Sequence, residues 1–336
     1  MNQRREFLKS LAILSSGIMV SDKLLAGQIN APSDKFGKVL PYRILGNTGE
    51  KVTMLGLGGF HVGWTTEKDA QEVIEKAMEG GIRFFDTAES YDDGGSEKRY
   101  GKYLVPKYRD QVFIMTKSAA RDAKTAKEHL EGSLKRMNCD VIDLWQIHSI
   151  RTPEDVDNRL EKEVLEVFQK AKDEGKVRHI GFTGHQNPFA HKQMLVSTKQ
   201  NNPFATVQMP VNVIDPHWHS FMENVFQEAI DRNLGILAMK TLSDGRFFKE
   251  KVRLGNVQYT TDNPLIPDAL SIKEALYYVW SLPVSVLITG AENKDLLTEK
   301  IDLASNFTKL TEKERLELVD RVAAYAGNKV EYYKKV

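Results

Sequence analysis

The sequence is poor in cysteine, in net charge and in long apolar stretches. Its single cysteine, Cys139, allows no intramolecular disulfide and no cysteine-based metal site, so we interpret it as structural. The eight histidines lack H-E-x-x-H or similar ligand spacing, and neither residue type predicts a metal. The formal net charge is +1, which leaves no basic excess to neutralise phosphates and argues against a nucleic-acid partner.

The 336 residues are 41% hydrophobic and 28% charged, which is typical of a soluble globular protein. This length is enough for one large α/β domain or two small ones. The sequence contains no low-complexity tract, and it contains no internal repeat beyond alternating strand-like and helix-like stretches.

Residues 1–27 predict a targeting segment rather than part of the fold. Arg4 and Arg5 form a twin arginine followed by Phe-Leu-Lys, and a short apolar stretch runs from Leu11 to Val20. This stretch is too short and too interrupted for an ordinary transmembrane helix. A basic start before a short apolar region is typical of a signal peptide. The segment resembles a twin-arginine export signal, which implies recognition by that export machinery and a periplasmic location.

Two features depart from the usual export signal. Gln3 stands where Ser or Thr is usual, and Leu24-Leu25-Ala26 matches a cleavage site only in part. An uncleaved signal would tether the protein to the membrane. The alternative is a basic start of a cytoplasmic protein. Residues 28–38, rich in small and polar side chains, are interpreted as a linker to a domain over residues 39–336.

Strand-like and helix-like stretches alternate from residue 39 onward. A short hairpin with a Gly/Asn turn is expected over 42–53. The expected strands are 54–58, 82–85, 112–115, 141–147, 177–182, 205–209, 235–239 and 284–288. The expected helices are 67–79, 97–104, 123–137, 160–174, 188–198, 221–232, 271–281, 295–305 and 312–326, and 241–268 is expected to be a long polar loop. Eight strands that each precede a helix, with one extra C-terminal helix, predict a TIM (β/α)8 barrel.

An open, doubly wound α/β sheet is the competing fold. It would require Gly-x-Gly-x-x-Gly at the start of the first helix. Gly56, Gly58 and Gly59 come near this pattern, but the spacing fails and no helix is expected directly after them. We therefore interpret these glycines as a tight loop at the end of the first strand.

Polar side chains follow three successive strands of the expected barrel. Asp86 ends the second strand with Tyr91 in the loop behind it, Lys117 ends the third, and His148 ends the fourth. Because barrel strands end on one common face, these four side chains are expected to share a site. Taken singly, they could be a cap, a surface phenol, a solvated strand end and a core histidine. Chance would then have to place an ionisable group at the same end of all three strands.

The order of these residues resembles that of the aldo-keto reductases, and the resemblance spans residue 39 to the C-terminus. It rests on Phe85-Asp86-Thr87-Ala88, on Tyr91 with Gly95-Ser96-Glu97, on Thr116-Lys117, and on Asp143-Leu144 through His148-Ser149. The resemblance implies a metal-free, nicotinamide-dependent oxidoreductase that interconverts a carbonyl and an alcohol.

The chemistry of carbonyl reduction suits these four side chains. The carbon must receive a hydride and the oxygen a proton, and a phenol with a pKa of about 10 holds its proton too tightly to donate well. A neighbouring cation lowers the pKa of a phenol, so Lys117 is expected to lower that of Tyr91, with Asp86 keeping Lys117 charged. Tyr91 would be the general acid, and His148 would orient the carbonyl oxygen and stabilise the developing oxyanion.

The resemblance also implies a nicotinamide site at later strand ends. In relatives, the equivalents of Thr183 and Gln208 hydrogen-bond the carboxamide, although Gln208 could instead be a satisfied interior amide. Gly184 stands where the family has Asn and cannot make the hydrogen bond of that side chain, so His185 is expected to substitute for it. Further cofactor-binding positions are expected at Gly58, Gly59, Met239, Lys240, Gly290, Asn293 and Glu299, with Met239 making a soft contact where many relatives stack a Tyr.

The segment after the eighth strand is expected to bind the adenosine phosphate end of the cofactor. A 2′-phosphate requires Arg or Lys, and NADP-dependent relatives place basic residues there. This chain has Glu292 and Leu296 near those positions, with Lys294 as the nearest cation. The expected cofactor is NAD or NADP, with NAD favoured.

Three loops carry aromatic and hydrogen-bonding side chains that we expect to rim a substrate pocket. Phe60, His61 and Trp64 follow the first strand, Trp218 follows the sixth, and Arg246 begins the long loop. Such a rim suits a small polar carbonyl or alcohol, for instance a sugar. The alternative is that these side chains pack on their own barrel.

An export signal conflicts with a nicotinamide cofactor, because soluble cofactor is scarce outside the cytoplasm. We therefore expect the cofactor to be exported in bound form and regenerated by a second substrate. Two alternatives remain open: a non-catalytic, nucleotide-binding regulatory barrel, as in the channel-associated subunits that resemble this family, and a plain cytoplasmic aldehyde reductase. The sequence does not predict the oligomeric state.

Overall fold

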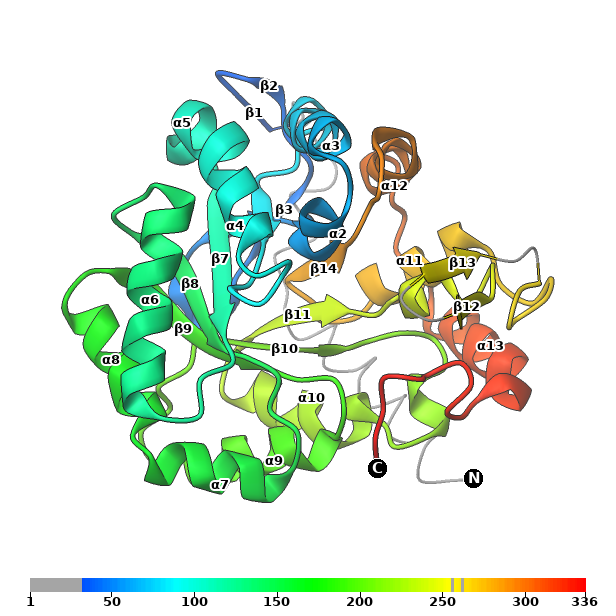
Figure 1. Ribbon diagram of the computed structural model, residues 1–336. Coiled ribbons are helices and arrows are strands. Elements are labelled where there is room, and N and C mark those ends of the chain that lie inside the picture. The colour runs from blue at the N-terminus through cyan, green and yellow to red at the C-terminus, as the bar shows by residue number, and fades with distance from the viewer. Residues whose placement is uncertain (1–31, 255–256, 261–262) are drawn as a thin grey trace.

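The computed structural model describes residues 32–254, 257–260 and 263–336, and the predicted export signal lies outside them. Eight parallel strands close into a barrel surrounded by helices, which confirms the predicted TIM barrel (Figure 1). In the order in which they pair, the strands are β5 (Leu55–Gly58), β6 (Phe84–Asp86), β7 (Phe113–Ser118), β8 (Ile142–Ile147), β9 (Val177–Thr183), β10 (Thr206–Pro210), β11 (Gly235–Met239) and β14 (Val286–Thr289).

The helices cover the outside of the barrel and bury an apolar face against it. Several begin at side-chain caps, including Thr66, Asp122 and Ser271. The helices are α2 (Gly59–Trp64), α3 (Glu67–Glu79), α4 (Gly95–Arg99), α5 (Val105–Tyr108), α6 (Ala123–Met137), α7 (Pro153–Glu161), α8 (Val164–Asp173), α9 (Pro188–Ser197), α10 (Phe221–Asp231), α11 (Ile272–Trp280), α12 (Lys294–Ser305) and α13 (Glu312–Val322). Within the described residues, none of the helices has the length and apolar character needed to cross a membrane.

The predicted hairpin is present as β3 (Tyr42–Ile44) and β4 (Lys51–Thr53), and it closes the amino-terminal end of the barrel. Leu45 and Val52 are buried in one cluster with the inward-facing apolar side chains of the barrel strands. The part of the expected linker that the structure describes forms a small ribbon, β1 (Ser33–Asp34) with β2 (Gly37–Lys38). Asp34 in this ribbon forms a 2.6 Å salt bridge with buried Arg83.

Three local predictions were wrong. Helix α2 begins at Gly59, directly after β5, where a loop was expected. A Cβ at position 59 would lie 2.4 Å from the Asp86 carbonyl oxygen, so only glycine allows this approach. The helix expected over 160–174 corresponds to α8, and α7 before it was not expected; α7 starts at a Thr152 cap followed by Pro153. The expected polar loop contains a hairpin, β12 (Lys251–Leu254) with β13 (Val257–Thr260).

Candidate active site

The barrel brings the predicted catalytic residues together at the carboxyl ends of its strands. The Lys117 Nζ lies 2.5 Å from Asp86 Oδ1 and donates a 3.1 Å hydrogen bond to the Tyr91 hydroxyl. It also donates a 2.7 Å hydrogen bond to the Thr87 carbonyl oxygen. Register explains the arrangement, because Asp86 on β6 pairs with Met115 on β7, two residues before Lys117. The predicted contacts among Asp86, Lys117 and Tyr91 are therefore present.

Burial controls the electrostatics of this group. Asp86 and Lys117 are 3% and 1% exposed. Burial lowers the pKa of Lys117, but the nearby Asp86 and Tyr91 outweigh it and hold this pKa above its usual value. Burial raises the pKa of Tyr91 above 10, and the Lys117 ammonium opposes this rise without reversing it. The expected net lowering of the Tyr91 pKa was therefore wrong, because the effect of burial on the phenol exceeds that of the Lys117 charge.

His148 follows β8 and stands beside the phenol. The two rings lie 5.9 Å apart, edge to face, at 79°. Its Nδ1 lies 3.5 Å from the Ser90 hydroxyl and 4.0 Å from Glu89 Oε2. Burial, followed by the charge of Lys117, lowers the pKa of His148 well below 6.5, so the ring is neutral at pH 7. A neutral imidazole beside Tyr91 suits a hydrogen-bond donor to a carbonyl oxygen.

Thr183 and Gln208 lie directly opposite each other in the register of β9 and β10. Both are buried, and Gln208 Oε1 has no hydrogen-bond partner within residues 32–254, 257–260 and 263–336. A buried amide oxygen without a partner is costly, and it fits a ligand that donates an N–H, such as a nicotinamide carboxamide. A Cβ at Gly184 would lie 2.5 Å from the Ile150 carbonyl oxygen, which accounts for the missing Asn there.

Two of the other residues expected at the nicotinamide, His185 and Lys240, contact the C-terminal tyrosines. The rings of His185 and Tyr333 are 6.4 Å apart, and burial lowers the pKa of His185 to about 3. Lys240 Nζ donates a 3.2 Å hydrogen bond to the Tyr332 hydroxyl, and Met239 is half-buried at the end of β11.

Residues expected at the adenosine end mostly serve the fold around α12. Asn293 caps this helix by accepting a 3.1 Å hydrogen bond from Leu296 N. Glu299 is exposed on its outer face. A Cβ at Gly290 would lie 2.1 Å from His61 Nδ1, so this glycine allows the loop after β14 to pack against α2. Gly58 similarly packs β5 against the end of β14.

The predicted substrate residues fall into two groups. Phe60 and Trp64 lie on α2 and are 49% and 62% exposed, and the Phe60 ring lies 5.5 Å from the Tyr91 ring. His61 on the same helix lies 3.8 Å from Asp244 Oδ1 and 3.8 Å from Glu292 Oε1. Trp218 and Arg246 belong to a second group that contacts the C-terminal residues instead.

The C-terminal residues 330–335 are a part of the site region that sequence reasoning missed. They contact loops after β9, β10 and β11: Lys335 N donates to the Gln186 carbonyl oxygen, Asn212 Nδ2 donates to the Tyr333 hydroxyl, and Arg246 lies 4.2 Å from the Tyr332 ring centroid. Lys334 Nζ lies 2.9 Å from Asp215 and 2.7 Å from Glu331, all fully buried. No sequence motif predicted these contacts. The adjacent aromatic residues Tyr332 and Tyr333 were the one feature of this segment that could have suggested packing against the barrel.

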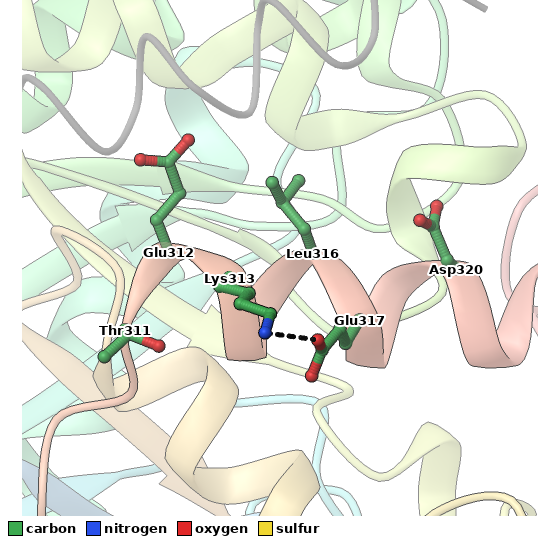
Figure 2. A pocket seen from close by; sticks show the side chains of 6 residues that line it. All are labelled: Thr311, Glu312, Lys313, Leu316, Glu317 and Asp320. Carbon is green, nitrogen blue, oxygen red and sulfur yellow. Dashed lines mark ion pairs between the residues drawn. The ribbon is translucent and has the colours of Figure 1, made fainter.

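A hollow of about 500 Å³ lies elsewhere, along α13 (Figure 2). Lys313 pairs there with Glu317 at 3.8 Å, and the other lining residues are Thr311, Glu312, Leu316 and Asp320. None of the four predicted catalytic residues lines it. We interpret this hollow as an ordinary solvated helix surface.

A (β/α)8 barrel whose strand ends gather Asp, Tyr, Lys and His defines the aldo-keto reductase class of oxidoreductases. The model of the Aldo/keto reductase family matches residues 54–331, and the chain belongs to this family. Members of the family use nicotinamide nucleotides.

Related proteins agree with this membership. The chain is 32% identical to the aldo-keto reductase YhdN of Bacillus subtilis (strain 168), over 61% of this chain and 63% of that relative. It is 35% identical to L-galactose dehydrogenase of Arabidopsis thaliana, over 42% of this chain and 48% of the relative. The structure of aldo-keto reductase AKR11C1 from Bacillus halodurans (holo form) has a TM-score of 0.68 at 22% identity, covering 84% of this chain and 96% of that one, and shows the same fold.

Proposed function

We propose that this protein interconverts a carbonyl and an alcohol by NAD(P)-dependent hydride transfer, with Tyr91 as general acid. The observation that carries this proposal is the buried Asp86–Lys117 pair, whose ammonium contacts the Tyr91 hydroxyl at 3.1 Å. Burying an ion pair costs free energy, and a buried ammonium that contacts a phenol is suited to proton transfer.

Each residue has a distinct task in this proposal. The nicotinamide nucleotide would supply the hydride when bound. Tyr91 keeps its proton until negative charge develops on the substrate oxygen, because burial disfavours the phenolate in the resting site. Once the proton has moved to that oxygen, Lys117 stabilises the resulting phenolate, and Asp86 keeps Lys117 charged. His148 donates a hydrogen bond to the oxygen and orients it.

Thr183 and Gln208 would hold the carboxamide of the nicotinamide. Their opposed positions on β9 and β10 and the unpartnered Gln208 Oε1 fit this group. We propose further contacts from His185, Met239 and Lys240, which lie at the ends of neighbouring strands.

NAD is the proposed cofactor. Lys294, the cation nearest the expected 2′-position, is engaged with Glu72 Oε2 at 3.1 Å. Exposed carboxylates lie just before this helix, at Glu292, and in its second turn, at Glu299. This acidic environment disfavours a 2′-phosphate and accepts the hydroxyl of NAD.

The proposed substrate is a sugar or a similar polar carbonyl compound. Phe60 and Trp64 are exposed, Phe60 lies against Tyr91 and Trp64 lies against Phe60, and exposed aromatic rings pack on the C–H surface of a sugar ring. Two relatives support this class by name: the L-galactose dehydrogenase above, and 6-dehydroglucose reductase of Novosphingobium aromaticivorans, 31% identical over 42% of this chain.

We further propose that residues 1–27 direct export by the twin-arginine machinery, and that the cofactor is exported in bound form and regenerated by a second substrate. The twin arginine at Arg4 and Arg5 supports the first part. A size comparison of the exported and precursor forms tests it, because a protein of full precursor size confined to the cytoplasm would contradict export.

The test of the proposed function begins with freshly purified protein. Any bound nucleotide is extracted and identified, and NADH and NADPH consumption is then followed with a panel of sugar aldehydes and apolar aldehydes. We expect stoichiometric NAD(H) that exchanges slowly, together with turnover of polar carbonyls. Tighter NADPH binding would overturn the NAD assignment, and turnover of apolar aldehydes alone would overturn the sugar assignment. Nucleotide binding without any turnover would support the regulatory barrel.

A further inference from the structure

Glu89 is a buried carboxyl beside the site that has no role among the four catalytic residues. Its side chain is 8% exposed, and its Oε1 accepts a 2.8 Å hydrogen bond from Ala119 N. Among the described residues, none forms a hydrogen bond with its Oε2, which lies 4.0 Å from His148 Nδ1. A buried oxygen without a partner, facing a catalytic imidazole, calls for an explanation in terms of that imidazole.

The Nδ1 side of His148 is occupied by protein groups. Ser90 Oγ lies 3.5 Å from Nδ1, and Glu89 Oε2 lies beyond it. The substrate oxygen would therefore meet Nε2. A neutral imidazole carries one hydrogen, and the partner of one nitrogen decides which nitrogen holds it. His148 donates to a carbonyl only when this hydrogen is on Nε2.

We propose that Glu89 is a positioning residue that selects the tautomer of His148, an inference that rests on the proposed function. When Glu89 is protonated, its hydroxyl faces Nδ1, the ring hydrogen stays on Nε2, and the ring donates to the carbonyl oxygen. When Glu89 is ionised, its carboxylate draws the ring hydrogen to Nδ1 and the substrate oxygen has no donor from the ring. The change releases the Glu89 proton to solvent and moves the ring hydrogen from Nε2 to Nδ1, and the imidazole is neutral in both states.

The charges around Glu89 decide when this change occurs. His129 on α6 lies 3.4 Å from Glu89 Oε1, His148 faces Oε2, and Glu97 on α4 is a nearby acid. Burial raises the pKa of Glu89 above 4.5, Glu97 raises it further, and the Ala119 amide and His129 oppose the rise. The His129 side chain is 31% exposed, and its Nδ1 also lies 2.9 Å from the Ser118 hydroxyl.

Reductase activity should therefore fall as pH rises through the pKa of Glu89. Removal of one donor to a developing oxyanion costs about 10²-fold in kcat. In Glu89→Gln, the side-chain amide donates to Nδ1 at every pH, so this alkaline fall should disappear while activity at low pH is kept. Glu166→Gln on the exposed face of α8 is the matched control and should keep the fall. His129→Gln removes a neighbour that lowers the pKa of Glu89, and it should move the fall to higher pH.

The decisive measurement is the 15N NMR spectrum of the histidine ring nitrogens in substrate-free protein across pH. We expect the His148 hydrogen to move from Nε2 to Nδ1 as pH rises in the wild type, and to stay on Nε2 in Glu89→Gln. The same tautomer in both proteins throughout would overturn the proposal. This readout needs no turnover, so an inactive protein would contradict the proposed function while the spectra still decide the role of Glu89.

Discussion

The ammonium nitrogen of Lys117 lies 3.1 Å from the Tyr91 hydroxyl oxygen. In the proposed reaction, the free energy of this contact differs before and after proton transfer. Before transfer, burial keeps the phenol protonated, and the pKa of Tyr91 lies above its ordinary value. After transfer, the same ammonium faces a phenolate and stabilises it strongly in a site of low dielectric. In the proposed reaction, Lys117 would therefore favour the late stage over the resting state, which is the property that catalysis requires.

Lys117→Met should destabilise the protein more than the double variant Asp86→Asn/Lys117→Met. The single change leaves the Asp86 carboxylate, 3% exposed, without its 2.5 Å partner. Removing one member of a buried pair costs about 3–5 kcal/mol, whereas removing both charges costs much less. Chemical denaturation of the three proteins at neutral pH measures the difference, and equal stability of the single and double variants would contradict the assigned ion pair.

Gln208→Leu should weaken nicotinamide nucleotide binding by about tenfold, the equivalent of one hydrogen bond of about 1–2 kcal/mol. Stability should change little, because the Gln208 Oε1 has no partner among the described residues in the ligand-free protein. Fluorescence titration with NADH measures the affinity, and Gln193→Leu on α9 serves as the control. Unchanged affinity would show that Gln208 is only an interior amide.

Glu72→Gln should raise the affinity for NADPH while leaving that for NADH unchanged. The Glu72 carboxylate holds Lys294 Nζ at 3.1 Å, so its removal frees the ammonium for a 2′-phosphate. Glu75→Gln, on the same helix, is the matched control because its carboxylate accepts from Gln71 instead. If both variants bind NADPH like the wild type, the 2′-position lies elsewhere.

Glu331→Gln should flatten the pH dependence of stability near neutrality. Burial raises the pKa of Glu331 from 4.5 to about 7, Lys334 opposes this, and the charge of Asp215 adds to it. Because the folded pKa is the higher one, the protonated carboxyl stabilises the docked C-terminal residues fully below pH 4.5, and this contribution is lost as pH rises through about 7.

Thermal unfolding between about pH 4 and pH 8 measures this slope. The exposed Glu299→Gln should keep the wild-type slope. If the pH dependence of thermal stability persists in Glu331→Gln, another titrating group causes it.

The barrel was predictable because its signals are local. Short apolar stretches indicated the strands, and helix stops such as Gly80-Gly81 placed the ends of helices within a few residues. The clustering of the four candidate catalytic residues followed from their positions at strand ends, since parallel strands share one carboxyl face. Helix α7 was missed because it is strongly polar, although Thr152-Pro153 marked its start.

Contacts between distant segments were beyond the sequence pattern. Asn212 and Tyr333 are hydrogen-bonded across 121 positions, and no motif in either segment predicts this contact. The pKa of Tyr91 was misjudged for the same reason, because burial depends on the whole fold. Glu89 carries no sequence signal, because the direction of its side chain, toward His148 and His129, is set by the packing of a loop.

The central claim is that Tyr91 donates the proton to the substrate oxygen, and Tyr91→Phe tests it most directly. The variant keeps the ring packing against Phe60 and removes only the hydroxyl that contacts Lys117. Steady-state NADH consumption with an active carbonyl substrate, together with NADH titration, gives the result. The account predicts that kcat falls by about 10²–10⁴-fold while NADH binding is retained. Full reductase activity in Tyr91→Phe would contradict it.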